Sequence, residues 1–231
     1  MTNKSSLIFF PGLGFHASIW QPIADHFTND DARLYDLPMT PLPESWSALT
    51  DQMNQTLPDE AILIAWSLGG IIAASLCHQF PKKYKKLILV ATTPQFSDET
   101  IGIQPALIQQ FKKEAIHDFP NLLKKLKILA AYPNRQIHFY KKLNTPLFKQ
   151  EHQTTFLFYL NLLMQIDIRD CYAHLFLPTL QIFGEQDAIL PLASAKHLAE
   201  KYPNFSTHII KGASHIPFLS HPQEFLNCII F

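Results

Sequence analysis

The chain has 231 residues, of which 47% are hydrophobic, enough for one sizeable domain with a full core. Its 19 Lys and Arg residues balance 19 Asp and Glu residues, and this net charge of zero argues against nucleic-acid binding by the whole surface. No stretch approaches the roughly 20 apolar residues of a membrane span, and residues 7–10 are too few for the apolar part of a signal peptide. The three cysteines lack metal-like spacing and indicate a reducing compartment, so we expect a cytoplasmic protein.

Strand-like and helix-like patterns alternate in the first 94 residues. We predict strands over residues 6–10, 33–37, 61–66 and 87–91, and helices over about 19–27, 47–55 and 68–80. The basic run over residues 81–86 is interpreted as a solvated turn at the end of a helix.

The alternation stops between Pro94 and about Leu177, where helical patterns fill residues 106–114, 119–131 and 154–166. It then resumes with a strand over 178–184, a helix over 192–202, a strand over 206–211 and a helix from Pro222. We therefore predict an α/β fold with an open, mostly parallel sheet of about six strands and helices on both faces. Residues 1–94 and 178–231 form its core, and residues 95–177 form an inserted helical lid.

Ser67 stands between the apolar run over 61–66 and the helical pattern that begins at Leu68. A strand, a serine and a helix, with the small residues Ala65 and Gly69 beside the serine, are the context of a nucleophile elbow. The elbow strains the serine backbone and exposes its hydroxyl. Because Ala65 replaces the first Gly of the G-x-S-x-G motif, an ordinary helix N-cap serine is the alternative interpretation.

Two loops after the last predicted strands carry candidate partners for Ser67. His215 follows the final strand, at the carboxyl edge of the sheet where Ser67 also emerges. The loop after the preceding strand supplies Asp187, with Glu185 as the weaker rival. The chain order Ser67, Asp187, His215 is that of an α/β-hydrolase triad, in which histidine activates the serine and the carboxylate orients the histidine.

An oxyanion hole for such a triad needs two N–H donors about 3 Å from the developing negative oxygen. The backbone N–H of Leu68, directly after the serine, is one candidate. The other is the N–H of Leu13 in the exposed loop Pro11-Gly12-Leu13-Gly14, although a plain turn would also explain that loop. Ester hydrolysis by these groups needs no metal or other cofactor.

Five stretches carry a resemblance to a known family: Pro11-Gly12-Leu13-Gly14, Tyr35-Asp36-Leu37-Pro38, Ala65-Trp66-Ser67-Leu68-Gly69-Gly70, residues 184–191 and residues 212–222. With them the chain resembles α/β-hydrolase carboxylesterases that cleave pimeloyl-[acyl-carrier protein] methyl ester in biotin synthesis. The resemblance implies this substrate, an acyl-carrier protein as partner, and substrate contacts at Leu13, Trp66 and Leu126. We expect a monomer.

The sequence departs from the family pattern at three places. Pro11 stands where histidine is usual, Leu13 where tryptophan is common, and Met39-Thr40-Pro41 replaces a glycine-rich stretch. The family's opening strand hairpin is also absent, so six strands are expected rather than eight. These differences concern acyl-chain specificity, and the triad is unaffected.

The predicted lid is basic. Between Lys112 and Lys149 the sequence has nine Lys or Arg and two acids, a balance of 9 − 2 = +7 in a chain with no net charge. Solvated helix faces would explain any single lysine. In the resembling family lid arginines contact the acidic carrier, and by spacing Lys125 and Lys142 fall nearest their positions, with Lys124 adjacent, so the resemblance implies docking by these three lysines.

Two alternatives remain open. A general short-chain carboxylesterase or thioesterase would use the same fold and the same triad. A catalytically silent binding protein would share the fold alone, since a fold does not determine a function, and an intact triad argues against it.

Overall fold

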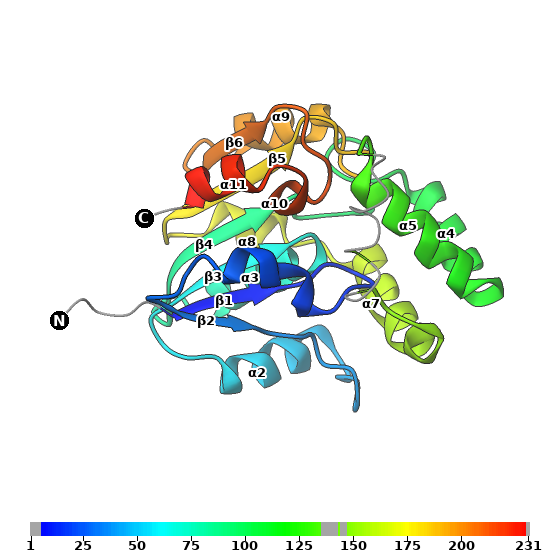
Figure 1. Ribbon diagram of the computed structural model, residues 1–231. Coiled ribbons are helices and arrows are strands. Elements are labelled where there is room, and N and C mark those ends of the chain that lie inside the picture. Colours follow the sequence, from blue (N-terminus) through cyan, green and yellow to red (C-terminus); the bar gives the residue numbers. More distant parts are fainter. Residues whose placement is uncertain (1–5, 135–142, 144–146, 230–231) are drawn as a thin grey trace.

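A parallel β-sheet forms the centre of the fold in the computed structural model, which describes residues 6–134, 143 and 147–229 (Figure 1). The six strands described are β1 (Ser6–Phe10), β2 (Asp31–Leu34), β3 (Ala61–Trp66), β4 (Tyr84–Val90), β5 (Thr179–Gly184) and β6 (Ser206–Ile210). Their order in the sheet is β2-β1-β3-β4-β5-β6, and every neighbouring pair is parallel. The predicted open parallel sheet is confirmed.

Both faces of the sheet are buried under helices, which is why the central strand β3 is apolar at every position. In β3, Leu63 and Ala65 belong to the core cluster on one face, while Ile64 and Trp66 belong to the cluster on the other. The first face packs against α2 (Trp46–Thr56), α3 (Leu68–Gln79), α8 (Arg169–Ala173) and α9 (Leu192–Lys201). The second packs against η1 (Ala17–Trp20), α1 (Gln21–Ala24), α10 (Pro217–Ser220) and α11 (Pro222–Ile229).

The described parts of the chain between β4 and β5 contain mainly helices. They are α4 (Pro105–His117), α5 (Phe119–Ala131), η2 (Gln150–His152) and α7 (Gln153–Gln165), followed by α8. α4, α5 and α7 lie together at one side of the molecule (Figure 1). α4, α5 and α7 enclose a separate apolar cluster that includes Ile108, Leu122 and Phe156. Within the described ranges, none of the helices combines the length and hydropathy that a bilayer-spanning segment needs.

Several predicted boundaries are wrong. The helix expected over residues 19–27 is two short pieces, η1 and α1, with Pro22 in the first turn of α1. The strand expected over 33–37 is β2, which starts at Asp31 and ends at Leu34. Lys85 and Lys86, expected in a turn, belong to β4. The short helices α8 and α10 were not foreseen.

Candidate active site

Ser67 occupies a strained turn between β3 and α3. Its φ of 54° and ψ of −119° lie in a region that costs a non-glycine residue about 1–3 kcal/mol. The turn places the start of α3 directly against the loop after β1. The two segments are so close that a Cβ atom at Gly69 would lie 2.5 Å from the Pro11 carbonyl oxygen. Only glycine fits at position 69. Ser67 therefore lies at a strained, closely packed turn from strand to helix.

A buried carboxylate–imidazole pair lies in the two loops that follow β5 and β6. Oδ2 of Asp187 is 2.7 Å from Nδ1 of His215, and the two side chains are 0% and 2% exposed. The other oxygen of Asp187, Oδ1, accepts hydrogen bonds from the backbone N–H groups of Ile189 (2.7 Å) and Leu190 (2.9 Å). These bonds fix the carboxylate with one oxygen directed at the histidine.

Glu185, the rival carboxylate, has a different partner. Its Oε2 accepts a 2.9 Å hydrogen bond from the backbone N–H of Gly212, which has a φ of +72°. Its backbone N–H donates to the Ile210 carbonyl oxygen at 3.0 Å. Glu185 therefore braces the loop that leads to His215, and Asp187 holds the imidazole.

Trp66, the residue before Ser67, connects three parts of the site. Its indole Nε1 donates a 2.9 Å hydrogen bond to the backbone carbonyl of His215. A Cβ atom at Gly12 would lie 2.8 Å from the Trp66 ring, so glycine at position 12 lets the loop after β1 cross the indole. The Phe15 ring meets the same indole edge-on at a centroid distance of 5.2 Å. The hydrogen bond to His215 was not foreseen from the sequence.

Ser67 and His215 open into one apolar cavity, with about 620 Å³ of empty space partly open to solvent. Its walls come from the sheet loops, from the segment after β4 and from α4, α5 and α7: Leu13, Phe15, Trp66, Phe96, Ile103, Ile108, Phe111, Leu126, Ala130, Leu160, Leu163 and Ile189. Leu13, Trp66 and Leu126, the residues expected to contact substrate, all line it. Apart from Ser67 and His215, every lining side chain is hydrophobic, which suits an acyl chain.

The two expected oxyanion donors lie on adjacent segments beside Ser67. Leu68 is the first residue of α3, where N–H groups have no partner within the helix. Leu13 lies in the loop after β1, and its side chain forms part of the cavity wall. A 3.3 Å hydrogen bond from Phe15 N–H to the Gly12 carbonyl and a φ of +83° at Gly14 close that loop into a tight turn.

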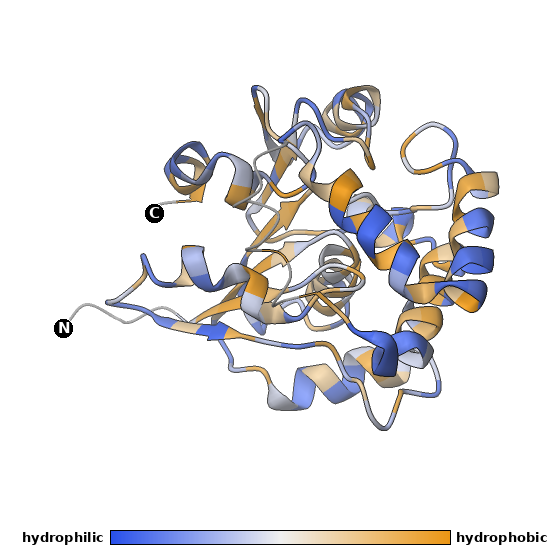
Figure 2. Cartoon of the chain, turned by 45° about the vertical axis from the view of Figure 1, so that its right-hand side comes forward, coloured by the Kyte–Doolittle hydropathy of each residue, from blue (hydrophilic) through white to orange (hydrophobic). Residues whose placement is uncertain are grey.

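The expected docking lysines have different environments. Lys124 and Lys125 are exposed on α5, along which hydrophilic and hydrophobic residues alternate (Figure 2). Nζ of Lys125 lies 2.9 Å from Oε2 of Glu114 on α4. This bond, with one from Gln110, lowers the pKa of Glu114 below its ordinary value. Lys142 lies outside the described residues.

Metal ligands do not gather in the part of the chain that the structure describes. There, no group of three or more His, Cys, Asp or Glu side chains is arranged to hold a metal ion.

Comparison with known proteins identifies the family over almost the whole chain. A family model described as "Alpha/beta hydrolase family" matches residues 7–227. The chain belongs to this family.

Several relatives named pimeloyl-[acyl-carrier protein] methyl ester esterase align with this alpha/beta hydrolase over almost its full length. The protein from Aeromonas salmonicida is 32% identical, covering 96% of this chain and 93% of its own. That from Wigglesworthia glossinidia brevipalpis is 34% identical, covering 99% and 93%.

Solved structures agree with this fold. An esterase from Exiguobacterium antarcticum superimposes with a TM-score of 0.82 at 16% identity, covering 98% of this chain and 91% of its own. A bromoperoxidase from Bacillus anthracis gives 0.80 at 18% identity, with 97% and 90% covered. At such identities the likeness concerns the alpha/beta hydrolase fold alone.

Proposed function

We propose that the chain is a serine carboxylesterase that hydrolyses pimeloyl-[acyl-carrier protein] methyl ester to the free acid and methanol. The observation that carries the chemistry is the buried Asp187–His215 pair, which opens with strained Ser67 into one apolar cavity. The substrate is supported by relatives of that name, at 32% and 34% identity over more than 95% of the chain.

Each group of the site has one role in this reaction. His215 takes the proton of the Ser67 hydroxyl as the serine oxygen attacks the ester carbonyl. Asp187 keeps the imidazole in the tautomer with a proton on Nδ1, because its Oδ2 faces that nitrogen at 2.7 Å. His215 then gives its proton to the departing methoxide, which leaves as methanol.

Water completes the cycle. His215 takes a proton from a water molecule, whose oxygen attacks the acyl-serine, and returns the proton to Ser67 as the free acid is released. In both halves the N–H groups of Leu13 and Leu68 stabilise the negative oxygen of the tetrahedral intermediate. No metal or cofactor takes part.

Residues 95–177 act as a lid in this proposal. Six cavity-lining residues lie on α4, α5 and α7: Ile108, Phe111, Leu126, Ala130, Leu160 and Leu163. They cover the acyl chain while the carrier stays outside. Lys124 and Lys125 on the outer side of α5, together with Lys142, attract the acidic carrier by charge. One chain supplies the whole triad, so a monomer suffices.

Growth without biotin tests this proposal. The gene is introduced into a bacterial strain that lacks its own pimeloyl-carrier methyl esterase, and the Ser67→Ala variant serves as the matched control. We expect growth with the wild-type gene alone. Should wild type fail to support growth while the purified protein hydrolyses small esters, a general short-chain esterase or thioesterase becomes the better conclusion.

A further inference from the structure

Thr92, two residues beyond the end of β4, contacts the backbone of Ser67. Its hydroxyl Oγ1 donates a 2.7 Å hydrogen bond to the Ser67 carbonyl oxygen, and the side chain is fully buried. The same oxygen accepts a second hydrogen bond, 2.9 Å long, from the backbone N–H of Gly70. The carbonyl of the candidate nucleophile is thus held from two directions.

That carbonyl shares one rigid peptide group with the N–H of Leu68. A trans peptide is planar, and its C=O and N–H point in opposite directions. Any rotation that moves the Ser67 oxygen therefore swings the Leu68 N–H by the same angle. By its hydrogen bond to the Ser67 oxygen, the Thr92 hydroxyl sets the direction of the Leu68 N–H. The proposed mechanism uses this N–H as an oxyanion donor.

The backbone at Ser67 needs such restraints because its φ of 54° is unfavourable for a residue with a side chain. On its other side, the Ser67 N–H donates to the Val90 carbonyl oxygen at 2.9 Å. Thr92 also packs tightly, since a Cβ atom at Gly70 would lie 2.7 Å from Thr92 Cβ, Cγ2 and Oγ1. Little room remains for the Thr92 hydroxyl to turn away.

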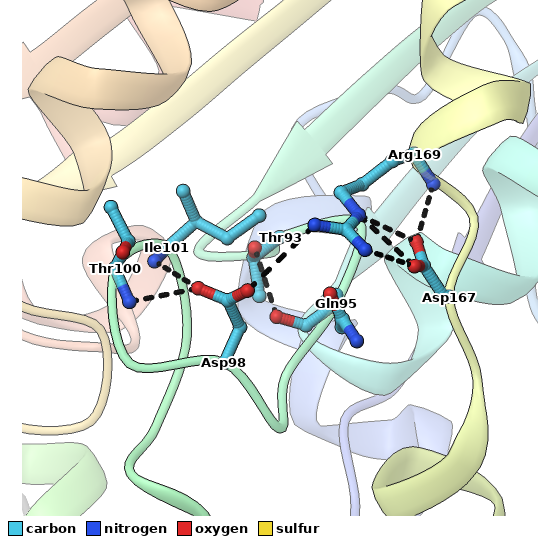
Figure 3. Close-up of polar contacts among 7 residues, drawn as sticks. All are labelled: Thr93, Gln95, Asp98, Thr100, Ile101, Asp167 and Arg169. Carbon is cyan, nitrogen blue, oxygen red and sulfur yellow. Dashed lines mark hydrogen bonds and ion pairs between the residues drawn. The ribbon is translucent and has the colours of Figure 1, made fainter.

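The segment that carries Thr92 is itself anchored at both ends. Before it, the Ala91 N–H donates to the Ile182 carbonyl oxygen at 2.8 Å. After it, Oδ1 of Asp98 accepts hydrogen bonds from the backbone N–H groups of Thr100 and Ile101 (Figure 3). Arg169, 3.9 Å from Asp98, ties this loop to the start of α8.

The same guanidinium forms a bidentate ion pair with Asp167, in which Nε donates to Oδ1 and Nη2 donates to Oδ2 (Figure 3). Its hydrogen bonds lower the pKa of Asp167. Beside it, the Ile168 N–H donates to the Pro94 carbonyl oxygen at 3.0 Å. The loop after Thr92 is therefore bound to the segment before α8 by a hydrogen bond and an ion pair. These contacts restrain the position of Thr92 relative to Ser67.

We propose that Thr92 is a positioning residue that aims the Leu68 N–H at the oxyanion through the shared Ser67–Leu68 peptide. This inference rests on the proposed esterase function. Thr92 does not touch substrate. It acts on the transition state, because an oxyanion donor matters most when negative charge develops on the carbonyl oxygen.

The test compares Thr92→Val, which keeps the shape and loses the hydroxyl, with Thr92→Ser, which keeps the hydroxyl. Loss of a whole oxyanion donor costs about 10²–10³ in kcat, and the bond from Gly70 remains, so we expect Thr92→Val to lose roughly 10- to 100-fold. KM for p-nitrophenyl butyrate should change little. Thr92→Ser should stay within about threefold of wild type. Should Thr92→Val not fold, Thr92→Ala removes the same bond.

Thr50→Val is the matched control. Thr50 is also fully buried, and its hydroxyl donates to the Ser47 carbonyl oxygen at 2.9 Å within α2, away from the cavity. This variant should match wild type in kcat. A trifluoromethyl ketone, which Ser67 converts into a tetrahedral oxyanion, should lose affinity for Thr92→Val by the same factor as kcat/KM, and not for Thr50→Val.

Two outcomes overturn the inference. In the first, wild type is active and Thr92→Val keeps kcat within about threefold. In the second, Thr92→Ser is as impaired as Thr92→Val, which assigns the effect to packing. If wild type itself hydrolyses neither p-nitrophenyl butyrate nor the carrier-linked ester, the esterase proposal fails first, and the role of Thr92 fails with it.

Discussion

The indole Nε1 of Trp66 donates a 2.9 Å hydrogen bond to the backbone carbonyl of His215, although 149 positions separate the two residues in the sequence. Trp66 is covalently joined to Ser67, and its ring lies under Gly12 in the loop that carries Leu13. One side chain therefore touches the loop that carries His215 and the loop that carries Leu13, and it directly precedes Ser67. The relative positions of these three parts depend on it.

Replacing Trp66 with Phe should lower activity more than it lowers stability. The substitution removes the indole N–H and leaves the buried His215 carbonyl without that donor, which costs about 1–3 kcal/mol in unfolding free energy. We expect kcat on p-nitrophenyl butyrate to fall about tenfold or more, since the His215 loop loses its anchor. Steady-state kinetics and urea unfolding measure the two effects.

Trp20→Phe provides the control for that variant. Trp20 is also fully buried, and its Nε1 donates a 2.8 Å hydrogen bond to the Phe10 carbonyl oxygen. The stability loss should be similar, while kcat stays close to wild type. Equal losses of kcat in both variants would contradict the role assigned to Trp66.

Ser67→Ala should abolish turnover while preserving the fold. Alanine keeps the Cβ atom and the backbone bonds of the elbow, and removes only the nucleophilic oxygen. Because loss of the nucleophile leaves only binding and oxyanion stabilisation, we expect kcat to drop by at least about 10³-fold. Hydrolysis of p-nitrophenyl butyrate measures the loss, and near-normal activity in this variant would exclude Ser67 as the nucleophile.

Asp187→Asn should be far more damaging than Glu185→Gln. The N–H groups of Ile189 and Leu190 both point at the Oδ1 position, so the amide oxygen of the asparagine stays there. Its NH₂ group then faces His215 Nδ1 and favours the wrong tautomer, which costs on the order of 10⁴ in kcat in a comparable triad.

Glu185→Gln keeps an oxygen acceptor for the Gly212 N–H and should lose much less activity. Measured kcat values of the two variants decide the assignment. A crippled Glu185→Gln enzyme beside an active Asp187→Asn enzyme would reverse it.

Charge reversal on the lid should affect the hydrolysis of the carrier-linked ester and of a small ester differently. Changing Lys124, Lys125 and Lys142 to Glu should sharply lower kcat/KM for the carrier-linked ester and leave p-nitrophenyl butyrate nearly unchanged, because only the carrier is acidic. Added salt should weaken the carrier reaction of wild type for the same reason. Reversal at Lys125 also breaks its ion pair with Glu114, so thermal unfolding is measured alongside.

A second triple variant controls for net charge. Lys82, Lys85 and Lys201 are exposed and lie outside α4, α5 and α7, and their change to Glu alters the total charge by the same amount. This variant should process the carrier-linked ester like wild type. If it is impaired as much as the lid variant, docking by the lid lysines is wrong.

The central strands and the strand-to-helix turn at Ser67 were predictable because their signals are local. β3 is a short apolar run buried on both faces, β5 is buried at every position although it contains Thr179 and Gln181, and the change from strand to helix at Ser67 needs no distant contact to be recognised. The edge strand β2 gives a weaker signal, since it is only partly buried and pairs with β1 alone. The apolar pattern that continues from η1 into α1 hid the break between them.

The contacts that hold the site were not predictable in this way. The bonds from Trp66 to His215 and from Thr92 to Ser67 join loops that only the folded sheet brings together. From the sequence, Trp66 is expected to contact substrate and Thr92 has no predicted role, and neither bond is indicated. Asp187 and Glu185 lie two positions apart, and only their hydrogen-bond partners distinguish their roles.

Hydrolysis of the purified carrier-linked ester tests the central claim most directly. Pimeloyl-[acyl-carrier protein] methyl ester is incubated with wild-type protein or with Ser67→Ala, and the intact mass of the carrier and the released methanol are followed over time. The account predicts complete conversion to the free-acid carrier, with one methanol per ester, by wild type alone. An unchanged carrier ester in the presence of wild-type protein that hydrolyses p-nitrophenyl butyrate would contradict it.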